Sequence, residues 1–247
     1  MKINNLAEFI KTHVAEINNN DFTKVYKDAD ISLEHPASIT KLTEIFLDAG
    51  IEPLKYMKEV PDRYLDESKI TSVEIPNNIT SIGDYAFRNC TSLTSITIGK
   101  GVTEIGGFAF DNCKSLTSIT IPDGVKKIDF CAFDWCTGLK SVKLSNNIKR
   151  ISSWMFNHCE GLTNITIPDG VKKIGNSAFC KCTSLIDITI PNSVKVISPQ
   201  VFSDCVKLKD ISFTGTKEEW DAISKDNSWN YNTGNYTIHC TDGELKK

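Results

Sequence analysis

Nine cysteines are the residues of this chain most able to do chemistry, because a thiolate can bind metal, form a disulfide or attack an electrophile. Six of them recur at a constant interval of 23 residues: Cys90, Cys113, Cys136, Cys159, Cys182 and Cys205. One residue type at one position of every repeat indicates packing, since free cysteine behaves as a small hydrophobe. Thiols stacked about 5 Å apart have parallel Cβ directions, which disfavours disulfides. We therefore predict a buried cysteine column; a redox ladder or a thiolate metal site is the alternative.

Catalytic and metal-binding groups do not converge in the sequence. Four histidines are scattered along the chain: His13, His35, His158 and His239. Only His158 adjoins a column cysteine, and a Cys–His nucleophile needs an accessible thiolate that a buried column does not supply. Cys180 and Cys182 lack the two-residue gap of a zinc knuckle, and no HExxH, GxSxG or Gly-rich phosphate loop occurs. We predict no enzyme activity, no metal and no cofactor.

Aromatic residues replace small ones on the outer side of the middle repeats. Positions that hold Gly, Asn or Ser elsewhere hold Phe130, Trp135 and Trp154, and His158 takes the position of Trp135 one repeat later. Two aromatic residues of earlier repeats share the position of Trp154: Tyr85 and Phe108. Neighbouring turns bring such side chains together, and exposed aromatic patches beside basic residues are typical of interfaces. We predict a partner-binding patch of Phe130, Trp135, Trp154 and His158; packing against the turn is the alternative.

Basic residues recur in repeats three to six, in what we predict to be the loop after each strand. They are Lys126, Lys127, Lys149, Arg150, Lys172, Lys173 and Lys195. Stacked one turn apart, they form a stripe that can meet phosphates or an acidic protein. The alternative is that these charges serve solubility and discourage edge-to-edge aggregation.

The outward positions of the predicted strands hold mostly small hydroxyl residues, which contribute little to interfaces. We expect a plain solvated face over most of its length. The exception is the part of this expected concave face whose charges vary from repeat to repeat, which holds Lys140, Lys143, Asp187 and Asp210.

The elements that position these residues follow from the period itself, which runs without a slip from Ile70 to Phe213. Within each repeat Leu93, Ile96 and Ile98 and their equivalents alternate with polar residues, as in a half-buried strand. A fixed period of this length is typical of a solenoid, in which turns stack because no single turn can bury its apolar face. We predict an α/β-type, right-handed solenoid with seven parallel strands that begin at residues 70, 93, 116, 139, 162, 185 and 208.

The period divides the chain into three parts: a helical N-terminal cap over 1–69, the solenoid over 70–213 with six 23-residue repeats and a final strand, and a C-terminal cap over 214–247. Helical spacing of apolar residues supports the first part, and a short helix is expected from Leu54 to Lys58. That part is alternatively a separate binding or oligomerisation domain. In the last part Thr216 to Glu219 form a capping box, and Tyr236 to Ile238 resemble one more strand.

Composition favours a chain that stays in the cytoplasm. Its net charge is −3, without the basic excess of a typical nucleic-acid binder. The first residues show no apolar run or cleavage site of a secretory signal, and no stretch approaches the length of a membrane span. We therefore expect a cytoplasmic location and no membrane contact.

The pattern LxxIxIPxxVxxIGxxAFxxC, well shown by residues 121–144, resembles the BspA-like leucine-rich repeat of bacteria and protists. Gly215 to Trp220 and Tyr236 to Gly243 are similar to the ends of such proteins from gut Firmicutes. The resemblance implies a leucine-rich repeat solenoid and a binding protein that is usually secreted or displayed on the surface.

Three functions follow as hypotheses. The first is a non-enzymatic protein-interaction module, in a narrower form a bacterial or phage protein that binds and inhibits a host protein. The second is an anion-binding module that uses the basic stripe on nucleic acid or a nucleotide-like ligand. The third is a cell-surface adhesin that lacks its signal. The partner's identity and the oligomeric state stay open.

Overall fold

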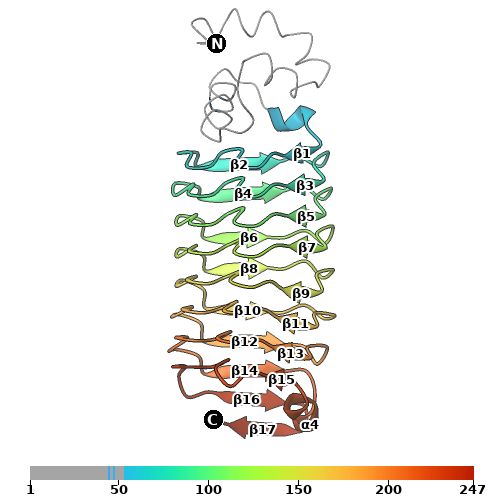
Figure 1. Cartoon of the computed structure of the whole chain (residues 1–247), viewed down its shortest axis with the longest axis vertical. Coiled ribbons are helices and arrows are strands. Elements are labelled where there is room, and N and C mark those ends of the chain that lie inside the picture. Colours follow the sequence, from blue (N-terminus) through green and yellow to red (C-terminus); the bar gives the residue numbers. More distant parts are fainter. Residues whose placement is uncertain (1–43, 45–46, 48–52) are drawn as a thin grey trace, which may run out of the picture.

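The computed structural model describes residues 53–247 together with Glu44 and Leu47. Figure 1 shows a stack of similar turns, each with one long and one short strand. This parallel-strand stack confirms the solenoid predicted from the period. The helical spacing predicted before Pro53 falls outside the described residues except at Glu44 and Leu47, which are both in helical conformation. The short helix expected from Leu54 to Lys58 is a single 3₁₀ turn, η1 (Pro53–Tyr56).

The long strands confirm all seven predicted strands. They are β2 (Ser72–Ile75), β4 (Ser95–Ile98), β6 (Ser118–Thr120), β8 (Ser141–Lys143), β10 (Asn164–Thr166), β12 (Asp187–Ile190) and β14 (Asp210–Phe213). Residues one period apart are direct partners, as in Ser72↔Ser95 and Asp187↔Asp210. On the long-strand face, equivalent residues of successive turns therefore lie side by side in rows. The polar side chains point outward, and the apolar side chains between them point inward.

A second column of short strands runs along the stack, and the sequence analysis does not predict it. It comprises β1 (Glu59–Val60), β3 (Ser81–Ile82), β5 (Glu104–Ile105), β7 (Lys127–Ile128), β9 (Arg150–Ile151), β11 (Lys173–Ile174), β13 (Val196–Ile197) and β15 (Ser224–Lys225). Two residues are too few to show alternation, so a recurring buried Val or Ile is the one mark of the short strands from β1 to β13, and β15 lacks even that. Pairing of β1 with β3 places stacked structure ahead of Ile70. The pairing is interrupted between β7 and β9.

The third side of each turn is irregular, as expected for the Ala-Phe segment. Its backbone amides donate to carbonyls of the next turn, for example Phe110 N to Ala132 O at 2.8 Å. Two positions per turn have left-handed backbone, as at Phe108 (φ 54°) and Asn112 (φ 61°). Such φ values cost free energy in residues other than glycine, so the turn needs its neighbours to hold it. We call this side the turn face.

The core is a ladder of identical side chains. Six fully buried phenylalanines, Phe87, Phe110, Phe133, Phe156, Phe179 and Phe202, stack with ring centroids 5.3–5.6 Å apart and planes within 12°. Offset stacking adds to the large apolar area that each ring buries. The ladder explains why the same residue recurs in every repeat.

The six column cysteines are buried and unpaired. Each thiol donates to a backbone carbonyl of a neighbouring turn, as Cys113 Sγ does to Phe87 O at 3.2 Å and Cys136 Sγ to Phe110 O at 3.1 Å. Burial raises the pKa of the Cys113 thiol well above its usual value, and the adjacent column thiols add to this. The predicted packing role is confirmed.

The C-terminal segment continues the stack and then changes direction. Helix α4 (Lys217–Asp221) begins at the predicted capping box, and its buried Trp220 packs edge-to-face on Phe213 at 5.2 Å. Strand β16 (Thr237–Cys240) lies parallel to β14, as predicted, and β17 (Gly243–Lys246) returns antiparallel. None of the helices in the described part of the chain has the length and apolar character that a membrane span requires.

The phenylalanine ladder predicts a large difference between two nearby substitutions. Phe133→Ala leaves a cavity between Phe110 and Phe156, so we expect a loss of about 3–5 kcal/mol in the free energy of unfolding. Phe130→Ala, at an exposed ring, is the matched control and should cost about 1 kcal/mol. Urea unfolding followed by circular dichroism measures both; equal losses would contradict the ladder's role.

The cysteine column predicts which thiols react in the folded protein. Cys180 and Cys240 are half-buried, whereas the six column thiols are fully covered. Iodoacetamide followed by mass spectrometry should find the first two labelled well before any column thiol. In denaturant all nine cysteines should label, which serves as the control. Native labelling of Cys136 as fast as Cys180 would show that the column opens readily.

Candidate functional site

The predicted aromatic residues lie on the turn face of the middle turns, on either side of β9. Phe130, Trp135 and Trp154 are 45%, 42% and 41% exposed, while His158 is half-buried. Trp135, Trp154 and His158 all occupy the left-handed positions of their turns. Few described residues are large, apolar and this exposed, and three of them belong to two consecutive turns. We call Phe130, Trp135, Trp154 and His158 the turn-face patch.

Within the patch the structure joins Trp135 to His158. Their rings stack with centroids 3.7 Å apart and planes 11° apart. Burial, and then the charge of Lys181, lower the pKa of His158, so its imidazole is neutral at pH 7. Its Nδ1 is buried without a hydrogen bond and lies 3.8 Å from Glu160 Oε1. The pair is a flat, preformed aromatic surface.

Phe130 belongs to a different row of rings. It meets Phe108 edge-on at 5.1 Å, and Phe108 stacks on Tyr85 at 4.9 Å. The guanidinium groups of Arg63 and Arg88 lie over Tyr85, at 4.6 and 5.1 Å from the ring centroid. The patch therefore continues toward the N-terminal turns through Tyr85 and Phe108. The shared repeat position of these two residues is the signal that could have placed them in the predicted site.

Trp154 stands apart from both groups: in the described part of the chain it makes no ring contact with Trp135, His158 or Phe130. The structure thus brings two of the four predicted residues together and leaves the other two as separate exposed anchors.

Two half-buried carboxyls lie on neighbouring turns beside the patch. Burial raises the pKa of Asp111 to about 6, with the charge of Asp134 adding to it. Burial likewise raises the pKa of Asp134 to about 6, although Asn157 Nδ2 donates to its Oδ1 at 2.9 Å. Among the residues that the structure describes, no group of three or more His, Cys, Asp and Glu side chains is arranged to hold a metal ion.

The basic stripe follows the short-strand column: three of its residues lie in strands instead of the predicted loops, and the other four lie in the loop between a long and a short strand. Lys127, Arg150 and Lys173 are in β7, β9 and β11, and the others come directly before these strands and β13. All seven side chains are exposed. Arg150 and Lys173 are direct partners across β9 and β11, and Lys127 forms an ion pair with Asp129 at 3.0 Å.

The charged part of the long-strand face does not form one cluster. Lys140 comes directly before β8 and Lys143 is its last residue. Neither forms an ion pair with another described residue. Asp187 and Asp210 are register partners on β12 and β14. Asp210 Oδ1 lies 2.7 Å from His239 Nε2, and this hydrogen bond raises the pKa of His239. Asp210 thus links its strand, β14, to β16 through His239.

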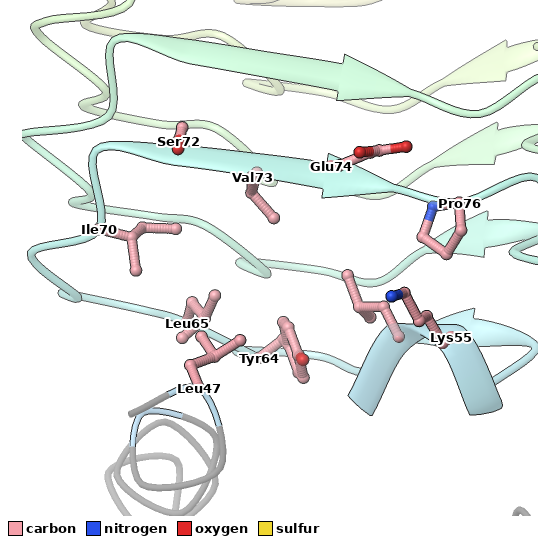
Figure 2. Close-up of a pocket in the computed structure, with 10 residues that line it drawn as sticks. Leu47, Lys55, Tyr64, Leu65, Ile70, Ser72, Val73, Glu74 and Pro76 are labelled. Atoms are coloured by element: carbon pink, nitrogen blue, oxygen red, sulfur yellow. The ribbon is translucent and has the colours of Figure 1, made fainter. Parts of the chain in front are cut away.

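A cavity of about 520 Å³ lies at the N-terminal end of the described stack. Figure 2 shows the residues that line it. Leu54, Tyr64, Leu65 and Val73 supply much of its apolar lining, and Glu74 lies at its margin. Leu47, also in the lining, is flanked by residues outside the described part of the chain. The cavity lies against the N-terminal end of the described core, where Tyr64 and Leu65 are buried.

Comparison with protein families identifies the repeat. The family model described as "BspA type Leucine rich repeat region" matches in six copies over residues 58–129 and 104–230. These ranges contain every short strand, every long strand from β2 to β14, and the turn-face patch. A search among curated proteins finds no match.

Three solved structures illustrate the likeness. A leucine-rich cell surface protein from Faecalibacterium prausnitzii is 30% identical, with a TM-score of 0.55, over 70% of this chain and 55% of that one. The leucine-rich repeat protein of T. pallidum is 29% identical, with a TM-score of 0.57, over 62% of this chain and 76% of that one. A leucine-rich repeat protein from Eubacterium ventriosum shares the fold at 24% identity, with a TM-score of 0.62, over 71% of this chain and 46% of that one.

This chain thus spans about half the length of the first of these proteins. The period, the paired columns of parallel strands and the matched family model agree with one another. The chain belongs to the BspA-type leucine-rich repeat family.

Proposed function

We propose that the chain is a non-enzymatic protein-binding module whose contact surface is the turn-face patch. Leucine-rich repeat proteins are generally binding scaffolds, and their repeats suit protein interaction or surface binding. The observation that carries the proposal is the exposure above 40% of Phe130, Trp135 and Trp154, three large aromatic side chains that belong to two consecutive turns. Exposed aromatic clusters of this kind are where interfaces concentrate their binding energy.

The geometry of the patch favours tight contact at low entropic cost. Trp135 rests flat on His158, so a partner meets a ring that is already held in place. Trp154 and Phe130 flank this pair as separate anchors, each able to fill a partner's pocket. Charged residues such as Glu160 and Lys181 are exposed nearby and supply a polar rim.

A bacterial or phage protein that inhibits a host protein is a narrower form of this proposal, and a cytoplasmic location accompanies it. The nine unpaired cysteines support that location, because thiols persist in reducing compartments. Surface binding is the second candidate, and it is favoured by the description of the Faecalibacterium prausnitzii relative as a cell surface protein.

Substitutions taken from the chain's own repeats test the patch without disturbing the turn. Asn112 occupies the position of Trp135 and Ser177 that of Trp154, and both have the same left-handed backbone. We expect the double variant Trp135→Asn, Trp154→Ser to weaken partner binding at least 30-fold, since a truncated hot-spot residue typically costs about 2 kcal/mol. Thermal unfolding should shift by only a few degrees.

The measurement is capture by the tagged full chain from bacterial lysate, identification by mass spectrometry, and titration of the purified partner. Tyr231→Ser, at a 68% exposed tyrosine near the other end of the stack, is the matched control and should bind like the unaltered chain. Undiminished binding by the folded double variant would overturn the proposal.

A further inference from the structure

In the first turns of the stack, a carboxylate from one turn caps a backbone N–H of the next. Asp62 Oδ1 accepts a hydrogen bond from Asp84 N at 2.7 Å, and Asp84 Oδ1 accepts one from Gly107 N at 2.7 Å. Asp62, Asp84 and Gly107 occupy the same position of successive turns, which is the second residue after the end of the short strand. We call it the capping position; in the next two turns it holds Phe130 and Ser153.

The series of carboxylates stops in the middle of the stack. Gly107 has no side chain, and Phe130 N donates to the carboxylate of its own neighbour, Asp129, at 2.9 Å. The Phe130 side chain has no hydrogen-bond acceptor, and Ser153 N donates a hydrogen bond to none of the described residues. The Phe130 ring lies back over Gly107, where an added Cβ would meet Phe130 Cε1 at 3.2 Å. It therefore leaves the Ser153 amide uncovered.

A pocket of about 180 Å³ opens at this point. It is lined by Asp129, Phe130, Arg150, Ile151, Ser152, Ser153, Lys173 and Gly175. It lies where pairing between β7 and β9 is interrupted. In the turn before, the backbone N–H of Asp129 donates to Ile105 O. At the equivalent carbonyl, Ile128 O, the donor is instead the side-chain hydroxyl of Ser152, at 2.5 Å. The local backbone thus presents donors that the neighbouring turns do not consume.

The charges around the pocket complete a site for an anion. Arg150 and Lys173 line it as register partners, and neither side chain forms an ion pair with a described residue. The one carboxylate in the lining, Asp129, is held by Lys127 at 3.0 Å and by Phe130 N at 2.9 Å. A guanidinium, an ammonium and a backbone N–H are the donors that carboxylates and phosphates select.

We propose that this pocket binds a single small oxyanion, a carboxylate or a phosphate group. Its oxygen takes the place on Ser153 N that the Asp84 carboxylate takes on Gly107 N two turns earlier. The proposal is independent of the turn-face patch as a protein-binding surface, although Phe130 borders both. It also separates Arg150 and Lys173, which line the pocket, from the other residues of the basic stripe, which do not.

The test follows the amide signal of Ser153 in ¹⁵N–¹H spectra of the full chain. Sodium phosphate and sodium acetate are titrated separately at an ionic strength held constant with sodium chloride. We expect a saturable shift of the Ser153 signal with at least one of the two anions. Saturation by phosphate alone or by acetate alone supports the proposal and identifies the group that the site prefers. No saturable shift with either anion overturns it.

Matched variants distinguish a built site from diffuse attraction. Arg150→Gln should weaken binding about tenfold, whereas Lys126→Gln, in the same stripe but outside the pocket, should leave it unchanged. Equal losses in both variants overturn the proposal in favour of the stripe's general field. Ser153→Pro removes the donor and copies Pro199, which follows Ser198 at the same position of a later turn. Calorimetric titration of this folded variant should show no binding; retained binding overturns the assignment of the amide.

Discussion

The structure depends on one constraint, which is that each turn must find its hydrogen-bond and packing partners on the turns beside it. Amides of one turn donate to carbonyls of the next, each Phe ring of the ladder stacks on an equivalent ring, and each column thiol donates to a backbone carbonyl of a neighbouring turn. Inward positions therefore have to be filled alike in every turn, because a change in one turn leaves a gap against two neighbours. Outward positions carry no such requirement, and it is there that the chain varies.

This division explains what the sequence can predict. The long strands, the phenylalanine ladder and the cysteine column are inward features that repeat, so their period reveals them. The short strands escape prediction because a pair such as Glu104-Ile105 is too brief to show alternation. The short strands form because the neighbouring turns supply their hydrogen-bond partners, so the sequence of a single turn does not predict them.

The site is predictable in part for the same reason. Departures from the repeat single out Phe130, Trp135 and Trp154, and the structure shows that each is exposed; their role in binding stays a prediction. Which rings meet depends on side-chain direction: Phe130 leans back toward Phe108, whereas Trp135 lies on His158. The uncovered amide of Ser153 leaves no mark in composition at all, because it is a backbone group made available by what the previous turn lacks.

The left-handed residues of the turn face determine how such a chain can change length. Each turn places two of them at the same phase, and the amide of Trp154, for example, then meets Asn176 O on the next turn. Inserting or deleting one residue within a middle turn moves both left-handed positions out of register with the adjacent turns. The backbone hydrogen bonds to the turn on each side are then lost together. Whole repeats can be gained or lost without this penalty. Irregular spacing is accordingly found at the ends, where β1 pairs with β3 and β13 with β15, so growth by duplication of complete units is the route open to this architecture.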